Sequence, residues 1–381
     1  MKSRKILFLC GDMDRSGGTE RVLATLANTL ARTGHDITIL SVQGGLQPFF
    51  ELDEAVKLDA LFSTPSRYLK RYPAIVSRLR HRLRTGCFDI LVDVEAMLTL
   101  VSLPAATGLK LRHICWDHFS FRIDLGRRLR RLARHLAAIF CDDVITLTEH
   151  DKRLWERSTW LRAALHALPN PTPFAPSSSP YPVDSRIVLS VGRPMHEKGH
   201  DLLLQAWSTI AHLAPDWTLR IVGHDDDLDT LRHVALCLGL QDRVQIVPPM
   251  HHIGAEYARA GIYCMSSRTE GFPLTLLEAL SFGLPVAGFD CDAGPREILE
   301  GCGVTLVEPG NIEELGQALL SLIHDPRTRL ALSALARMRA ADFQVAAVIP
   351  QWQALLEHAL DTSPWPESKP TSYGKGKAGA A

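Results

Sequence analysis

The chain has 381 residues, of which 46% are hydrophobic and 22% are charged, and its 42 basic residues balance 42 acidic ones. This composition is that of a globular protein, and it excludes wholesale disorder and a multi-span membrane protein, because no run of about 18 uncharged apolar residues occurs. The length suits two domains, each large enough to bury its own core. The eight cysteines are scattered without a CxxC pair, which favours reduced thiols in a cytoplasmic protein.

Apolar runs of strand length alternate with amphipathic stretches of helix length up to about residue 325, a pattern typical of parallel βαβ units. In the first half, the expected strands are Lys5–Cys10, Asp36–Val42, Ile90–Val94, Leu111–Cys115 and Asp143–Thr148, with a helix at Thr19–Thr33. In the second half, they are Arg186–Gly192, Trp217–Gly223, Val244–Val247, Ile262–Ser266, Pro285–Phe289 and Gly303–Val307. The sequence therefore predicts an α/β fold with two Rossmann-like, doubly wound domains facing a central cleft.

Prolines mark the expected domain boundary. Residues 169–185 are rich in Pro and Ser, and we interpret them as a linker between a first domain at 1–168 and a second at 186–342. A helix within 343–361 is expected to pack back on the first domain. The tail at 362–381, rich in Ser, Pro, Gly and Lys, has nothing to bury and is predicted to be disordered.

Two cations follow a strand of the second half. Arg193 and Lys198 come directly after the strand at Arg186–Gly192, at the sheet edge where open α/β proteins bind their ligands. Two fixed positive charges at this place suit a diphosphate. The alternative is that both are solvated charges of a loop.

A second loop is expected at the same edge. The strand Ile262–Ser266 leads into Glu270-Gly271-Phe-Pro273, and a helix of about ten residues follows, which Pro273 begins and Gly283 ends. Gly271 lets the backbone approach a ligand, the helix N-terminus favours negative charge, and Glu270 can accept hydrogen bonds from hydroxyl groups.

Glu278 lies further along the same expected helix, where Leu276, Leu277 and Leu280 would pack inward. A carboxylate among such apolar neighbours needs a partner, which the hydroxyl groups of a ribose would supply. The alternative, a surface helix with an acidic N-terminal cap, explains Glu270 but leaves Glu278 unexplained.

The two glutamates, with seven residues between them and Gly271-Phe-Pro after the first, resemble the E-x7-E signature of retaining GT-B glycosyltransferases of family 4. Supporting segments are Arg193 with Glu197-Lys198-Gly199, Asn170-Pro171, and Phe289-Asp290-Cys291 with Gly294-Pro295. The resemblance extends over about residues 5 to 325.

The resemblance implies a role for each residue. Arg193 and Lys198 would bind the diphosphate of a UDP- or GDP-sugar, and Glu278 would hold the ribose. Glu270 would hold the transferred sugar together with the following donor-binding residues, which are Gly271, Phe272, Pro273 and Leu274. The two cations and the helix dipole would replace a metal, so no metal or other cofactor is expected.

The first half offers two further segments. Gly17 and Gly18 precede a helix, where backbone amides can meet a phosphate or an acceptor, and a Gly-Gly loop in this place faces the donor in the family. The loop is neither GxGxxG nor a P-loop, which argues against a nicotinamide dehydrogenase or a nucleoside triphosphatase. Asp117 and His118 follow a strand, and His118 could relay a proton or orient a substrate hydroxyl, although most of the 16 histidines are ordinary residues.

The run Asp225-Asp226-Asp227 looks like a metal-chelating DxD motif. Because it follows a strand and precedes a helix, N-capping and solvation explain it, and we assign no metal to it.

Arginines crowd residues 67–84 and 122–136, and Leu125, Leu129, Leu132 and Leu136 form an apolar stripe at helical spacing. A basic amphipathic helix suits an anionic membrane surface, for example the inner face of the cytoplasmic membrane. The alternative is that the stripe packs on the domain's own sheet with its arginines solvated. Nucleic acid is not an expected partner, because aromatic interleaving is absent.

The sequence thus predicts a glycosyltransferase that moves a hexosyl or N-acetylhexosaminyl group, with retention, to a glycan or lipid-linked oligosaccharide in cell-surface polysaccharide or lipopolysaccharide assembly. Glu270, His118, Arg193 and Lys198 are its candidate catalytic residues. The alternatives are a sugar-nucleotide hydrolase or epimerase of the same fold and a non-catalytic scaffold that binds sugar nucleotide.

Overall fold

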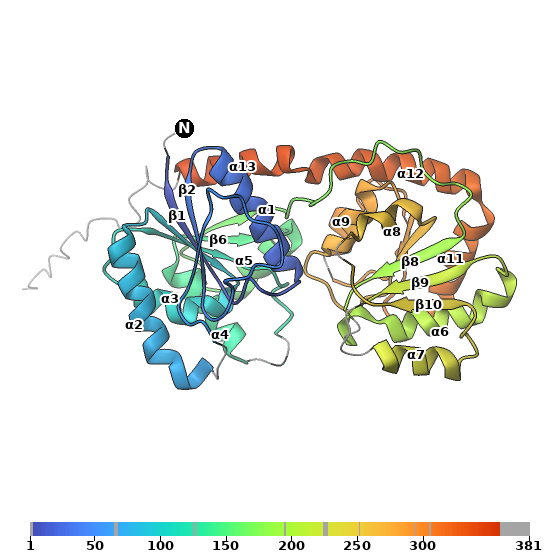
Figure 1. The fold of residues 1–381 in the computed structure, drawn as a ribbon, viewed down its shortest axis with the longest axis horizontal. Helices are drawn as coiled ribbons and strands as arrows, with labels where there is room; N and C mark the ends of the chain where they lie inside the picture. The colour runs from blue at the N-terminus through green and yellow to red at the C-terminus, as the bar shows by residue number, and fades with distance from the viewer. Residues whose placement is uncertain are drawn as a thin grey trace, which may run out of the picture.

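The structure is a computed structural model that describes residues 3–64, 68–124, 126, 128–193, 196–223, 228–250, 252–292, 294–304 and 306–358. Figure 1 shows two lobes side by side, each with a parallel sheet between helices. The predicted tail at 362–381 and the acidic run at 225–227 lie outside the described residues.

The first lobe holds a seven-stranded sheet of order β3-β2-β1-β4-β5-β6-β7, in which all neighbouring strands are parallel. Its strands are β1 (Lys5–Cys10), β2 (Asp36–Ser41), β3 (Lys57–Ala60), β4 (Ile90–Val94), β5 (Arg112–Trp116), β6 (Asp143–Thr146) and β7 (Ala164–Ala167). Its helices are α1 (Gly18–Arg32), α2 (Tyr68–Gly86), α3 (Thr99–Ala106), α4 (Arg128–Phe140) and α5 (Glu149–Ser158), with a 3-10 turn η1 (Ala96–Leu98).

The second lobe holds a five-stranded parallel sheet of order β10-β9-β8-β11-β12. Its strands are β8 (Ile187–Val191), β9 (Thr218–Val222), β10 (Val244–Val247), β11 (Ile262–Met265) and β12 (Val286–Gly288). Its helices are α6 (His200–Ile210), α7 (Leu228–Cys237), α8 (Gly254–Arg259), α9 (Leu274–Ser281), α10 (Gly294–Ile298), α11 (Ile312–His324) and α12 (Pro326–Ala340), with 3-10 turns η2 (His196–Lys198) and η3 (Ala211–Leu213).

Both faces of the first sheet are covered, because alternate residues of a strand point to opposite sides. Ile6 and Phe8 of β1 join a core with α1, whereas Leu7 and Leu9 join a separate core with α2 and α3. This arrangement confirms the predicted doubly wound α/β fold.

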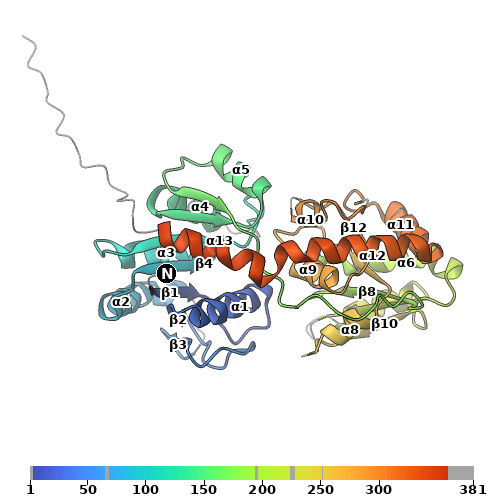
Figure 2. The same cartoon turned by 90° about the horizontal axis from the view of Figure 1, so that it is seen from above.

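The chain crosses between the lobes twice. It passes from β7 to β8 through residues 168–186, and it returns through η5 (Ala341–Phe343) to α13 (Val345–His358), which lies along the first lobe in Figures 1 and 2. The crossings are joined by a hydrogen bond of 2.7 Å from Thr172 N to Phe343 O. Trp352 of α13 packs against Trp116 of β5, with ring centroids 4.8 Å apart.

Two of the strands were not predicted, and one expected strand is reduced. Lys57–Ala60 and Ala164–Ala167 are the outermost strands of the first sheet, and none of their side chains is fully buried. Among the described residues of 303–307, a single parallel bridge joins Val307 to Phe289 in place of a strand. The second sheet therefore has five strands where six were expected.

Candidate active site

The centre of the candidate site is an ion pair at the carboxyl edge of the second sheet. Lys198 Nζ lies 2.6 Å from Glu270 Oε1, and Ser267 Oγ donates to the same oxygen at 2.6 Å. Lys198 follows β8 and Glu270 follows β11, and these strands are neighbours in the sheet. Within the part of the chain that the structure describes, both contacts go to Oε1, so Glu270 Oε2 can accept a hydrogen bond from a ligand hydroxyl.

Further contacts fix the two loops against each other. The Arg268 guanidinium binds the Asp201 carboxylate at 2.8 and 2.6 Å, and its backbone N–H donates to Glu197 O at 2.7 Å. Gly199 has a φ of 61°, and any side chain there would collide with the carbonyl oxygen of Ser266. These contacts hold Glu197 and Gly199, the two neighbours of Lys198, and so fix the place of Lys198 beside Glu270.

Glu278 is bound from both sides by protein groups. Arg21 Nη1 lies 2.6 Å from its Oε1, and the Tyr257 hydroxyl donates to its Oε2 at 2.7 Å. The carboxylate is only 3% exposed, and burial raises its pKa, although the Arg21 charge and the Tyr257 hydrogen bond oppose that shift. The partner that Glu278 needs is thus present in the protein, and Arg21 supplies it from the first lobe.

Segments of both lobes meet around this site. A methyl group at Gly17 would lie 3.7 Å from Arg193 Nη2, and one at Gly18 would lie 3.0 Å from Leu274 Cδ1. A methyl group at Gly271 would lie 2.8 Å from His118 O. The structure therefore brings the glycines, the cations, both glutamates and the His118 backbone to one junction between the lobes.

Two of the expected donor-binding residues, Phe272 and Pro273, have structural roles. The Phe272 side chain is 8% exposed and packs against the ring of Phe343 at 5.9 Å between centroids. Pro273 is the N-cap of α9 and has no N–H to donate. Only backbone atoms of Phe272 are thus placed for a donor, and the amides that this segment can offer are those of Gly271, Phe272 and Leu274.

His118 is buried beside the junction, with its ring 4.3 Å from the ring of Trp116. Burial lowers its pKa from 6.5 to about 4, so its imidazole is neutral at neutral pH. Its Nε2 has no hydrogen-bond partner within the described part of the chain. A neutral imidazole of this kind can bind a hydroxyl, but it is a weak general base.

The loop that carries His118 is organised by a buried arginine. Arg134 Nε binds Asp117 Oδ2 at 2.7 Å, and both side chains are fully buried. The guanidinium also donates to four backbone carbonyls, those of Phe119, Ser120, Phe121 and Ile123. Asp117 therefore holds this arginine in place, a pairing of residues 17 positions apart that no sequence pattern indicates.

Another carboxylate stands at the same edge of the first sheet. Glu95 directly follows β4, has a φ of 120°, and binds Arg130 at 2.8 Å. Such a conformation is strained for a residue with a side chain and is typical of functional positions. Glu95 was not among the predicted site residues, because a single acidic residue after a strand is a common feature.

The two arginine-rich segments differ from the expected membrane-facing pattern. Arg130 and Arg134 are 2% and 0% exposed, so they do not flank a surface stripe. On α2, Arg78 donates to Leu61 O and Arg80 to Ala105 O, so these arginines bind their own domain. The expectation of solvated arginines beside the leucine stripe is therefore wrong for Arg130 and Arg134. Arg67, Leu125 and Arg127 lie outside the described residues.

Asp151 gives this region a testable pH dependence. Burial raises its pKa from 3.8 to about 7, although its Oδ1 accepts a 2.6 Å hydrogen bond from Phe121 N. The folded state therefore keeps the proton that the unfolded chain loses, and stability should fall, on the order of 2–4 kcal/mol, as pH rises from about 4 to about 7.

The Asp151→Asn variant preserves the acceptor for Phe121 N and removes the titration. Urea denaturation of both proteins at several pH values should therefore show a steeper decline for the native chain. Parallel profiles would contradict the raised pKa of Asp151.

The protein is similar to solved structures of known fold and matches models of known families. An Anabaena protein, Alr3699/HepE, solved in complex with UDP and glucose, aligns with a TM-score of 0.80 at 20% identity, over 93% of this chain and 99% of its own. The two parallel-sheet domains thus define a GT-B glycosyltransferase fold. Two family models match the sequence: Glycosyltransferase Family 4 at residues 16–175, and Glycosyl transferases group 1 at residues 172–339.

Relatives extend the match to nearly the whole chain. A glycosyltransferase of Haemophilus influenzae is 34% identical over 93% of this chain and 100% of its own length. The amylovoran biosynthesis glycosyltransferase AmsD of Erwinia amylovora is 29% identical, over 92% of this chain and 99% of its own. An α-1,4-N-acetyl-D-galactosaminyltransferase of Campylobacter jejuni, named for a diphosphoundecaprenol-linked acceptor, is 27% identical over 92% and 98%. The chain belongs to the family 4 glycosyltransferases.

Proposed function

We propose that this glycosyltransferase moves a hexosyl or N-acetylhexosaminyl group from a UDP- or GDP-sugar to an acceptor hydroxyl with retention of configuration. The observation that carries the proposal is the Lys198–Glu270 pair at the carboxyl edge of the second sheet, with Arg193 close to Gly17 of the opposite lobe. Sites at this edge hold nucleotides in other open α/β sheets.

The cations support a mechanism without metal. As the bond to the sugar breaks, negative charge develops on the leaving diphosphate, and fixed positive groups stabilise that charge best. Lys198 and Arg193 provide two such groups, and the amide end of α9 adds a partial positive charge. Glu270 holds Lys198 in place and uses its other oxygen for a hydroxyl of the transferred sugar.

The reaction that we infer uses no covalent intermediate on the protein. Glu270 is engaged by Lys198 and Ser267, which makes its carboxylate a poor nucleophile. The neutral imidazole of His118 orients a hydroxyl group, and the proton of the acceptor passes to the leaving phosphate. This front-face path gives a product with the anomeric configuration of the donor.

The acceptor that we propose is a glycan or lipid-linked oligosaccharide of cell-surface polysaccharide or lipopolysaccharide assembly. The names of AmsD and of the Campylobacter relative support this class of acceptor. Among the described helices, none is both long and apolar enough to cross a membrane. We place the protein in the cytoplasm, with peripheral contact to the inner membrane face.

The test is a screen of nucleotide sugars, read first by binding and donor hydrolysis and then by NMR of the transferred product, all in excess EDTA. We expect one UDP- or GDP-sugar to be consumed and the product to keep the donor's anomeric configuration. An inverted product would overturn the proposed mechanism. Activity lost in EDTA and restored by Mn²⁺ would overturn metal independence, and hydrolysis without transfer to any acceptor would indicate a hydrolase.

A further inference from the structure

The exposed face of α4 is apolar. Leu129, Leu132 and Phe140 are 49%, 48% and 61% exposed, whereas the opposite face of the helix buries Arg130 and Arg134. Exposed apolar surface is unfavourable in water, and contiguous patches of it usually mark binding surfaces. Leu129 and Leu132 of the predicted stripe therefore lie on the face of α4 that points away from the sheet of their own domain, and the exposed Arg128 and Arg131 stand beside them.

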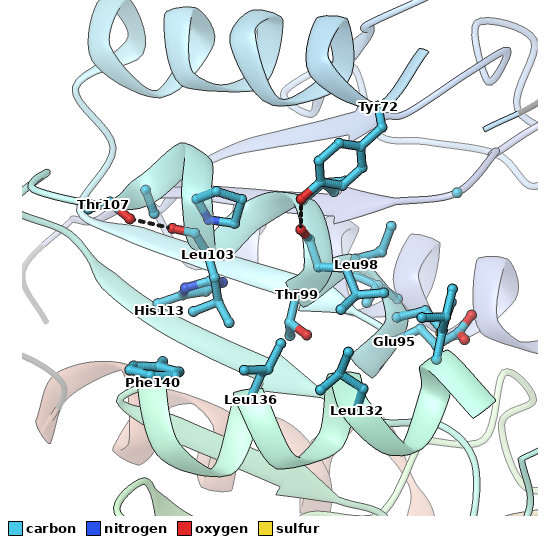
Figure 3. A pocket seen from close by; sticks show the side chains of 18 of the residues that line it. Tyr72, Glu95, Leu98, Thr99, Leu103, Thr107, His113, Leu132, Leu136 and Phe140 are labelled. Carbon is cyan, nitrogen blue, oxygen red and sulfur yellow. Dashed lines mark hydrogen bonds between the residues drawn. The ribbon is translucent and has the colours of Figure 1, made fainter. Parts of the chain in front are cut away.

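This stripe forms one wall of a groove of about 2010 Å³ in the first lobe. Figure 3 shows Leu132 and Leu136 pointing from α4 towards Leu98 and Leu103, which come from η1 and α3. Tyr72 of α2 lies beyond them, and its hydroxyl donates to Leu100 O at 2.8 Å. The groove follows α4, whose 13 residues rise about 20 Å, and the side chains that line its middle, among them Leu98, Leu103, Leu132 and Leu136, are apolar.

One end of the groove reaches the candidate active site. Gly11 and Arg15 line this end, and they belong to the loop that continues to Gly17 beside Arg193. The other end, lined by Lys110 and Phe140, lies at the opposite edge of the sheet. A chain bound along the groove would thus have its head group at the junction where transfer takes place.

The active-site end of the groove is also cationic. Arg128 lines it at the amino end of α4, which has no acidic residue in its first turn, and the Arg15 side chain is 69% exposed. Two acidic groups line the same end: Asp12 lies 3.8 Å from Arg15 and offsets its charge, and Glu95 pairs with the buried Arg130 at 2.8 Å. These three arginines and two carboxylates leave one positive charge in excess, at the exposed Arg128. An apolar channel that ends at exposed cations complements an amphiphile with a long hydrocarbon chain and an anionic head.

We propose that this groove binds the hydrocarbon chain of a lipid-phosphate acceptor, with the phosphate near Arg128 and Arg15 and the attached sugar at the active site. This assignment rests on the proposed function and deepens it, because it names the part of the protein that selects a lipid-linked acceptor. The apolar walls contribute affinity for the chain, and the loop from Gly11 to Gly17 places the head group relative to the donor.

The test uses purified full-length protein and farnesyl phosphate as the probe, with displacement of 1-anilinonaphthalene-8-sulfonate fluorescence as the readout. Leu132→Glu and Leu129→Glu place a charge in the groove at half-exposed positions that tolerate polar residues. Leu330→Glu is the matched control, because Leu330 is also 48% exposed but lies on α12 of the other lobe. Thermal melting of each variant verifies folding.

We expect either groove variant to weaken farnesyl phosphate binding at least 10-fold, and the control to match the native chain. Farnesol, which lacks the phosphate, should bind the native protein at least 10-fold more weakly than farnesyl phosphate. Unchanged farnesyl phosphate binding in both groove variants would overturn the proposal. If the native protein is a dimer that Leu132→Glu dissociates, the occupant of the groove is a second copy of the chain, and the proposal is overturned. If the protein binds phosphatidylglycerol vesicles but not the free probe, the occupant is the bilayer surface, and the proposal is overturned as well.

The result is separable from the proposed function. UDP-sugar binding and donor hydrolysis use the Lys198–Glu270 site at the junction of the lobes, which Leu129 and Leu132 do not line, and should persist in the groove variants. If donor hydrolysis persists and the groove variants bind farnesyl phosphate as tightly as the native chain does, only the groove assignment fails. If no nucleotide sugar is used but binding of the probe depends on Leu132, the proposed function fails, and with it the acceptor role of the lipid.

Discussion

Replacing Glu270 with alanine is expected to lower kcat/KM for transfer by about 10³-fold or more while the protein remains folded. The change removes the carboxylate oxygen that pairs with Lys198 Nζ at 2.6 Å, and it also removes the second oxygen, which we assign to the transferred sugar. Loss of a single preorganised group at a developing charge costs on the order of 10²–10³ in rate, and here two functions fall together. Steady-state kinetics with the donor found in the screen measures the effect.

Two variants serve as controls for this experiment. Glu270→Gln keeps an oxygen that can accept from the sugar and removes the charge, so its activity should lie between those of Glu270→Ala and the native chain. Glu300→Ala, at an exposed turn after α10, should behave as the native protein. Near-normal turnover by Glu270→Ala would refute the assignment of Glu270, and a large loss of thermal stability would make its role structural.

The parts of the fold that the sequence predicted are those with a local signal. Central strands such as β1 and β4 contain apolar runs, Ile6–Cys10 and Ile90–Val92, because both faces of a parallel sheet are covered. The missed strands, β3 and β7, lie at the sheet edges, and their partly exposed residues carry no such run. Their formation depends on pairing with β2 and β6, which is tertiary information.

The same distinction applies to the candidate site. Lys198 and Glu270 could be placed together because each follows a predicted strand, and parallel strands present their carboxyl ends at one edge. The partnership of Arg21 with Glu278 joins residues 257 positions apart in different lobes, and no periodicity carries it. Tyr257 was missed for the same reason, since its hydroxyl reaches Glu278, 21 positions further along the chain, only in the folded structure.

The orientation of α4 shows where a periodic pattern leaves the answer open. Leucines at helical spacing predict an apolar stripe, but they do not say whether that stripe faces the domain's own core. The inward face instead consists of small alanines, Ala133, Ala137 and Ala138, together with two arginines. The buried arginines have Asp117, Glu95 and backbone carbonyls as partners, which the sequence does not bring together.

Replacing Arg134 with methionine is expected to destabilise the protein by about 3–5 kcal/mol, because the change leaves Asp117 charged in a fully buried position. Four carbonyls of the loop from Phe119 to Ile123 lose their donor at the same time. Urea denaturation measures the loss. Arg131→Met is the matched control on the same helix, because Arg131 is 69% exposed in its pair with Asp124 and should change stability by less than about 1 kcal/mol.

The double variant Asp117→Asn, Arg134→Met separates the buried charge from the lost hydrogen bonds. Because it removes the unpaired carboxylate, it should recover part of the stability that Arg134→Met loses. The carbonyls of the loop remain without their donor, so the loop should stay displaced in the double variant. Because the 118–120 backbone packs on Gly271, this displacement moves one wall of the sugar site, and transfer activity should stay low. Equal stability of Arg134→Met and Arg131→Met would show that the Asp117–Arg134 pair does not hold this wall.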